Sequence, residues 1–188
     1  MARWDPDAQG RLRQAAVALY LERGYEATTV AEIAERAGLT KRTFFRYFAD
    51  KREVLFAGSE SLQTDIVTAL RQAPAEVPPI EAVLQALATG GTAFGRYPDF
   101  ARQRRDLIAS SPDLQERELI KLASLTAAVA GALRDRGLDP RQAGLTAQAG
   151  VAAFTAAYER WVQDAAAGDF PALVRESLDD LRRAISAV

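Results

Sequence analysis

Helix start and stop signals follow one another closely in the segment 29–51. Thr29 stands three residues before Glu32, the spacing of a capping box that starts a helix. Gly38 tolerates the left-handed backbone conformation that a tight turn requires, so this helix is expected to end there. Thr40 then provides the cap for a second helix. Two short helices with so brief a connection predict a helix-turn-helix motif and restrict this part of the chain to helical structure.

The second helix of the motif is expected over residues 41–48, and its first turn carries basic and polar side chains. In helix-turn-helix proteins the N-terminal residues of the second helix meet base edges in the major groove. Lys41, Arg42 and Thr43 occupy these positions here. The spacing therefore predicts a helix that reads DNA.

The charge of this segment differs from that of the whole chain. The chain has 24 Lys and Arg against 25 Asp and Glu, a formal net charge of −1, so it is not a general polycation. Residues 36–52 hold six basic residues and only one acid, Asp50. A local excess of positive charge suits the neutralisation of phosphates. The alternative is a solvated face of amphipathic helices, and for Arg46 both interpretations stay open.

The segment from Arg11 to Phe56 resembles the DNA-binding domain of the TetR family of bacterial transcriptional regulators. The similarity is carried, in order, by LYLERGYEATTV, AEIAERAGLTKRTFFRYF and DKREVLF. The resemblance implies a helix-turn-helix DNA-binding domain over residues 1–55 and a ligand-binding and dimerisation domain over residues 56–188. It also implies an all-α fold of about nine helices, with the helix-turn-helix head at the N-terminus and the helical body at the C-terminus. Farther along the chain, the stretch PDFARQRRDLIASSPDLQERE resembles the C-terminal body of actinobacterial members of the family.

The resemblance also implies roles for individual residues at the DNA. Tyr47 keeps the hydroxyl with which the family contacts a phosphate, and Lys51 matches the family's lysine at the start of the fourth helix. The family usually has a tyrosine where Phe45 stands, and phenylalanine has no hydroxyl to offer a phosphate. The residues expected at the DNA are Thr29, Thr40, Lys41, Arg42, Thr43, Phe45, Arg46, Tyr47 and Lys51.

Beyond the motif, apolar residues recur at helical spacing, with proline and glycine at the breaks. Gly90, Gly91 and Gly95 lower the helical propensity of one segment, and they favour close helix packing over a kink or room for a ligand. Helices are expected over residues 51–72, from about 80, from 98, from 112 to near 137, from 140 to about 167, and from 171 onward.

Aromatic residues of the body are candidates for an effector pocket. Phe154, Tyr158 and Trp161 share one helix face, and small-molecule sites generally have aromatic walls with one or two polar anchors. These rings are also suited to a solid core. Arg104, close to Phe100 in the sequence, is either the anchor for an anionic group or a solvated surface residue that pairs with Asp99 or Asp106 on its own helix. The expected ligand-binding residues are Phe94, Phe100, Arg104, Leu107, Phe154, Tyr158 and Trp161.

An apolar stripe runs along the last helix and consists of Val174, Leu178, Leu181 and Ile185. Such a stripe must be buried, either inside one chain or against a second copy. The resemblance favours a second copy, because TetR-family proteins generally dimerise through their last two long helices. A homodimer is therefore expected, with two reading helices on a palindromic operator.

Composition removes several classes of function. The chain has no Cys and no His, which excludes disulfides, thiol chemistry and Cys/His zinc sites. Its serines have no histidine partner and no Gly-x-Ser-x-Gly elbow, so an enzyme is not expected. We expect no catalytic residue, no metal and no cofactor.

The remaining expectations concern location and mode of action. The N-terminus lacks the basic and apolar pattern of a signal peptide, and the longest apolar stretch is shorter than the roughly 20 residues that span a bilayer. A cytoplasmic protein without membrane contact is expected. Its expected partners are operator DNA and a small, largely apolar effector that releases the DNA. Repression rests on the resemblance, and a DNA-bound adaptor without a ligand stays as the alternative.

Overall fold

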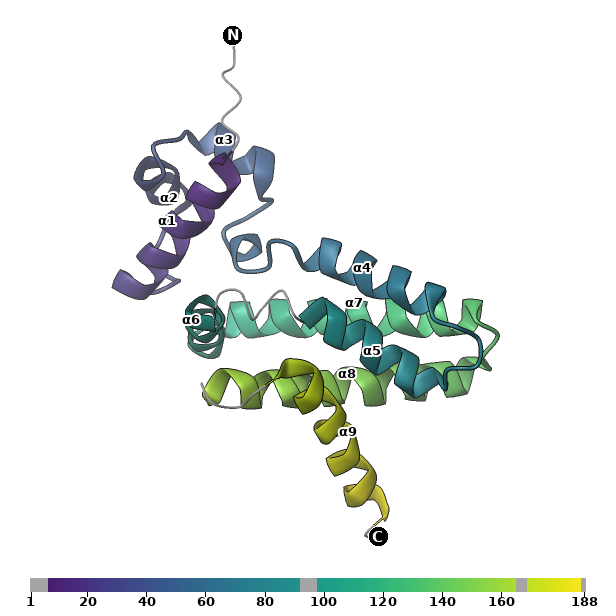
Figure 1. The fold of residues 1–188 in the computed structure, drawn as a ribbon. Helices are drawn as coiled ribbons and strands as arrows, with labels where there is room; N and C mark the ends of the chain where they lie inside the picture. The colour runs from purple at the N-terminus through teal and green to yellow at the C-terminus, as the bar shows by residue number, and fades with distance from the viewer. Residues whose placement is uncertain (1–6, 92–97, 165–168, 187–188) are drawn as a thin grey trace. The chain divides into compact units, whose positions relative to one another are not determined.

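The structure is a computed structural model, and it describes residues 7–91, 98–164 and 169–186. All regular structure in these ranges is helical, with nine α-helices and one short 3-10 helix (Figure 1). The all-α prediction is confirmed. The chain forms two compact units: a head unit of residues 1–57 and 103–118, and a body unit of residues 58–102 and 119–188.

The head unit is built on three helices, α1 (Ala8–Arg23), α2 (Val30–Arg36) and α3 (Lys41–Tyr47), followed by the 3-10 helix η1 (Arg52–Val54). Side chains from all four elements meet in one apolar core, because each helix turns one face inward. Within these four elements, the largest fully buried side chains are Leu12, Leu19, Tyr20, Ile33, Phe44 and Val54.

The sequence predicts one helix over residues 51–72, and this is wrong at its beginning. The carboxylate of Asp50 accepts hydrogen bonds from the two N–H groups that start η1, at 2.8 and 3.2 Å. Residues 54–56 are then buried one after another, which a helix with one inward face cannot achieve. Gly58, at a φ of +88°, resets the chain, and α4 (Ser59–Gln72) begins directly after it.

The body unit is a stack of longer helices. Besides α4 it contains α5 (Pro79–Gly91), α8 (Pro140–Gln163) and α9 (Phe170–Ser186). In Figure 1, α5 lies between α4 and α8, and α9 packs on α5 and α8. Two further helices, α6 (Pro98–Ala109) and α7 (Pro112–Asp135), contribute residues to both units.

Two glycines of α5 allow neighbouring helices to approach closely. A Cβ atom on Gly90 would lie 2.8 Å from Cδ1 of Leu62 on α4, and one on Gly91 would collide with the ring of Phe170 on α9. Close helix packing, the interpretation favoured from the sequence, is confirmed for both glycines. Gly95 lies outside the described residues.

The apolar stripe of α9 is buried mostly within one chain. Val174 and Leu178 are 0% and 4% exposed and belong to the same core as Phe154 of α8, and Leu181 packs on this core. Ile185, at the end of the stripe, is 69% exposed. The part of the stripe that was expected to meet a second copy is therefore largely occupied inside the monomer.

Candidate nucleic-acid interface

The helix-turn-helix forms as its capping signals predict. The Thr29 hydroxyl accepts a hydrogen bond from the Glu32 N–H at 3.3 Å, while the Glu32 carboxylate accepts one from the Thr29 N–H at 2.9 Å. Hydrogen bonds from Thr29 and the charge of Arg23 lower the pKa of Glu32. Gly38 takes up a φ of +65° in the turn, and the Thr40 hydroxyl accepts from the Thr43 N–H at 3.1 Å. Both threonine hydroxyls that were expected at the DNA thus serve as helix caps.

Helix α3 separates its buried and exposed faces sharply. Phe44 is 0% exposed, and its ring lies 5.4 Å from that of Phe48, which fixes the inner face. Lys41 and Arg42 are exposed on the other side, and neither has a hydrogen-bond or ion-pair partner in the described parts of the chain. Arg46 is exposed as well. The helix therefore presents three cations on the face that points away from the core.

The remaining basic residues of the segment 36–52 are engaged within the chain. Arg36 pairs with Glu22 of α1, and Arg52 pairs with Asp50 at 2.8 Å. Glu22 lies outside the segment, so a local count of charges could not include it. The available positive charge is therefore smaller than the sequence suggests and is concentrated on α3.

Lys51 was expected to contact a DNA phosphate, but its ammonium group has partners within the chain. Its Nζ donates to the backbone carbonyls of Tyr25, Thr28 and Glu26 at 2.8, 3.0 and 3.3 Å. It also lies 4.1 Å from the centroid of the Tyr25 ring. The three ammonium donors are thus used inside the head unit, where they hold the turn between α1 and α2.

Two buried tyrosines complete this junction. The Tyr20 hydroxyl donates to the backbone oxygen of Lys51 at 2.7 Å, and burial raises the pKa of that hydroxyl strongly. Burial and, secondarily, the charge of Asp113 raise the pKa of Tyr25 to about 12. Both hydroxyls stay neutral at physiological pH, and Lys51 is tied to α1 through Tyr20 and to the turn after α1 through its ammonium group.

Arg46 and Tyr47 interact with each other at the end of α3. The Arg46 guanidinium lies 4.9 Å from the centroid of the Tyr47 ring and donates to its hydroxyl at 3.1 Å. Both groups keep donors for an outside acceptor, since a guanidinium has five N–H donors and the phenol keeps its own proton. This pair is suited to phosphate contact.

The turn between α6 and α7 belongs to the head unit. No motif in the sequence predicts this. The Arg104 guanidinium donates to the Leu55 carbonyl at 2.9 Å, pairs with Glu118 at 3.0 Å and lies 4.9 Å from the Phe56 ring centroid. The Ser111 hydroxyl donates to the carboxylate of Glu26 at 3.1 Å. Arg117 pairs with Glu53, and Leu107 is buried in the same unit.

The aromatic residues expected around an effector form a compact cluster in the body unit. The ring of Phe170, which the sequence did not single out, lies 5.5 Å from that of Phe154 and 6.2 Å from that of Trp161. Tyr158 stacks beside Trp161 at 6.4 Å and donates through its hydroxyl to the Ala101 carbonyl at 3.4 Å. Phe100 belongs to this unit too. Phe94 lies outside the described residues.

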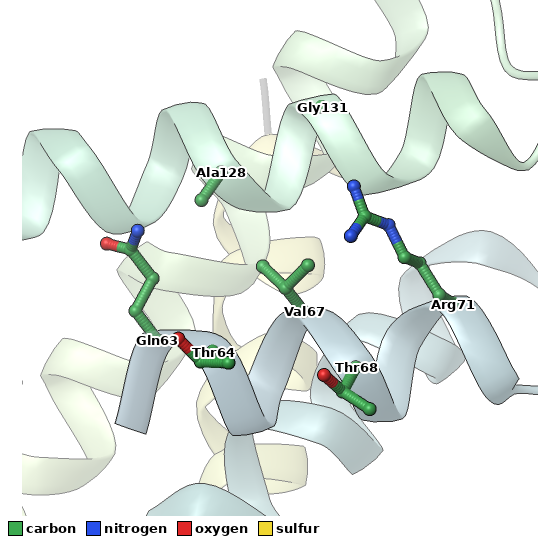
Figure 2. A pocket seen from close by; sticks show the side chains of 7 residues that line it. All are labelled: Gln63, Thr64, Val67, Thr68, Arg71, Ala128 and Gly131. Carbon is green, nitrogen blue, oxygen red and sulfur yellow. The ribbon is translucent and has the colours of Figure 1, made fainter. Parts of the chain in front are cut away.

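A separate groove of about 370 Å³ lies between α4 and α7 in the body unit. Figure 2 shows Val67 and Arg71 of α4 facing the small residues Ala128 and Gly131 of α7. The charge of Arg71 is balanced by Asp135, at 2.7 Å. The groove combines polar side chains with apolar ones such as Val67 and Ala128, and it contains none of the aromatic residues expected at an effector.

Comparison with known proteins decides the family. Residues 12–57 match the bacterial regulatory proteins of the tetR family, and residues 77–186 match the MftR C-terminal domain. The second match alone spans more than half of the 188 residues. The chain belongs to the TetR family. Its N-terminal part matches the regulatory proteins of that family, and its C-terminal part is an MftR-type domain.

The relatives of this TetR-family chain agree with the assignment. The regulator EthR of Mycolicibacterium smegmatis is 30% identical over 140 residues, 68% of this chain and 64% of EthR. The chain spans between 31% and 64% of the length of the first curated relatives that it matches.

Two solved structures share the fold. The SmeT–triclosan complex has a TM-score of 0.62 at 19% identity, covering 94% of this chain and 90% of SmeT. FadR of Thermus thermophilus with lauroyl-CoA has a TM-score of 0.56 at 22% identity, covering 91% of each chain. No helix in the described ranges of this TetR-family chain combines the length and the apolar character needed to cross a bilayer.

Proposed function

We propose that this regulator is a ligand-responsive repressor that binds a palindromic operator as a homodimer and leaves it when a small, largely apolar effector enters the body unit. The observation that carries the proposal is α3, whose inner face is fixed by Phe44 while Lys41 and Arg42 extend without partners in the described structure. Base edges and phosphates are the acceptors that such donors meet in a major groove. The protein would act in the cytoplasm, where its operator is.

The proposed dimer uses the exposed face of α8, with a contribution from the end of α9. Leu145 of α8 is 67% exposed, and Ala152 and Ala156 follow it on the same side of the helix with exposed side chains. Small side chains allow two helices to approach closely, and isologous contact of one face with itself gives a two-fold dimer. Its two α3 helices would meet half-sites about 34 Å apart.

The proposed effector site is the aromatic cluster of the body unit, with Phe100, Phe154, Tyr158 and Trp161. SmeT binds triclosan and FadR binds lauroyl-CoA, so proteins of this fold accept apolar ligands of different sizes. An effector acts only through a difference in affinity between the DNA-binding and released states. Since α6 and α7 have residues in both units, they are the elements through which we propose that the body acts on the head.

Arg42 should set base preference. Because Arg makes bidentate contacts to guanine that are worth about 1–3 kcal/mol, Arg42→Ala is expected to reduce discrimination between the selected operator and its single-base variants by about 5- to 150-fold. Fluorescence anisotropy with duplexes selected from a random-sequence library measures this. Arg71→Ala in the body unit serves as the control and should discriminate as the wild type does. Unchanged discrimination by Arg42→Ala would contradict the reading role of α3.

Tyr158 and Arg104 test the effector site. Tyr158→Phe removes one hydroxyl and little packing, so it should raise the effector concentration needed for operator release about fivefold while leaving DNA affinity without effector unchanged. Triclosan and lauroyl-CoA are the probes, preceded by a thermal-shift screen of apolar compounds. Arg104→Ala should alter only release if Arg104 anchors an anionic group, but should also alter DNA affinity without effector if its bond to Leu55 is structural. A protein that binds its operator but responds to no ligand would be an adaptor, and the proposal of a sensor would fail.

A further inference from the structure

Phe45 is an aromatic side chain held in solvent on the face of α3 that is proposed to meet DNA. It is 57% exposed, whereas its neighbour Phe44 is fully buried. The other large apolar side chains that are exposed in the described ranges are all aliphatic: Leu21, Leu119, Ile120, Leu145 and Ile185. An exposed phenylalanine lacks the stabilisation that burial of its ring would bring, and its ring is available for contact with another molecule.

The ring of Phe45 is held in its orientation by the buried ring of Phe44. Its ring meets that of Phe44 edge to face, with 5.5 Å between centroids and an interplanar angle of 83°. Edge-to-face contact is a preferred geometry of aromatic pairs, and Phe44 is itself fixed in the core. The Phe45 ring thus stands on a rigid base and extends outward.

The surroundings of Phe45 indicate what the ring meets. Residues three and four positions earlier on a helix are its surface neighbours, and these are Arg42 and Lys41, both exposed. A cationic surround disfavours an ordinary apolar protein partner and suits a polyanion. Phenylalanine can donate no hydrogen bond to a phosphate or a base edge, so its contact with DNA must be apolar.

The major groove offers one apolar group that differs between base pairs, the C5-methyl of thymine. We propose that Phe45 is a specificity-determining residue that reads the C5-methyl group of one thymine in each operator half-site. This inference rests on the proposed function, since it requires α3 to lie in the major groove. Arg42 and Lys41 supply the polar contacts of the same turn, and Phe45 adds discrimination by shape and apolar contact.

Deoxyuridine isolates the methyl group, because it differs from thymidine only by that group and keeps every hydrogen-bonding atom. Wild-type protein is used to select a duplex from a random-sequence library. Each thymine of the selected duplex is then replaced by deoxyuridine, one symmetric pair at a time, and affinities are measured by anisotropy. At one thymine position the wild type should lose about fourfold per half-site, the loss expected for one unburied methyl group, or about 15-fold for the pair.

Phe45→Ala should bind the thymine and uracil duplexes equally at that position, since the ring that contacts the methyl group is gone. Its thermal unfolding should match the wild type, because more than half of the side chain is exposed. Leu21→Ala is the matched control: it removes an exposed apolar side chain from α1 of the same unit, 49% exposed, and should keep the wild-type preference for thymine.

The outcomes separate the possible failures. If the wild type binds every uracil duplex as tightly as the thymine duplex, or if Phe45→Ala shows the same loss as the wild type, Phe45 does not read thymine. A uniform loss in Phe45→Ala on selected and random duplexes alike would mean that the ring packs on sugar carbons, which also overturns the inference. If the wild type selects no sequence at all, the operator proposal fails and the reading role fails with it.

Discussion

Leu178→Glu is expected to unfold the body unit rather than to separate two folded protomers. Leu178 is 4% exposed in a core that it shares with Val174 and Phe154. The substitution removes a buried apolar side chain and places a carboxylate in an apolar core, a combined loss of about 5 kcal/mol or more. This is comparable to the whole stability of an ordinary domain. Far-UV circular dichroism and size-exclusion chromatography with light scattering should show loss of helix and aggregation.

Ala152→Glu is the matched variant on the exposed face of α8. It introduces the same charge at an exposed position, so the chain should stay folded while the proposed dimer dissociates into monomers of half the mass. A dimeric Ala152→Glu protein would show that another surface holds the two copies together. A folded Leu178→Glu protein with wild-type helicity would contradict the burial of the α9 stripe within one chain.

Lys51→Met should lower the free energy of unfolding by about 3 kcal/mol. Methionine keeps most of the length of the side chain but loses three charge-assisted hydrogen bonds to the turn between α1 and α2, and such bonds contribute about 1.5–3 kcal/mol each before allowance for solvent access. The contact with the Tyr25 ring is weakened as well. Urea unfolding followed by circular dichroism measures the loss.

Lys41→Met provides the comparison, because Lys41 has no partner in the described structure and the variant should stay within about 0.5 kcal/mol of the wild-type stability. For DNA binding the two variants should differ in the opposite sense, in the slope of the logarithm of affinity against the logarithm of salt concentration. Lys41→Met should reduce the slope by about one counterion per protomer, and Lys51→Met should leave it unchanged in the folded fraction. The reverse pattern would indicate that Lys51 contacts a phosphate, as the family resemblance implies.

The helix-turn-helix could be predicted from the sequence because its determinants are local. A capping box joins residues three apart, and the turn needs only one glycine at positive φ. The roles of Thr29, Gly38 and Thr40 can therefore be predicted without knowledge of the rest of the fold. The start of α4 could not be predicted in this way. It depends on residues 54–56 all being buried in the head unit, which is a tertiary requirement.

The candidate site was predictable in its residue types but not in its pairings. Glu22 neutralises Arg36 from 14 positions away, and Lys51 bonds to carbonyls 23 to 26 positions earlier. Arg104 likewise bonds to a carbonyl 49 positions before it. Such contacts leave no periodic pattern in the sequence, so charge counting overestimates the cations that are free for DNA.

The membership of residues 103–118 in the head unit has a consequence for building hybrid regulators. A designer who wishes to move this DNA-binding specificity onto a foreign sensor would cut after the helix-turn-helix, near residue 57. That graft would leave behind the partners of Glu26, Glu53 and the Leu55 carbonyl, namely Ser111, Arg117 and Arg104. The transplantable piece is thus discontinuous, and the recipient must supply a helical corner with the same three side chains. Recombination between family members would meet the same restriction, so compatible corners should be inherited together with their heads.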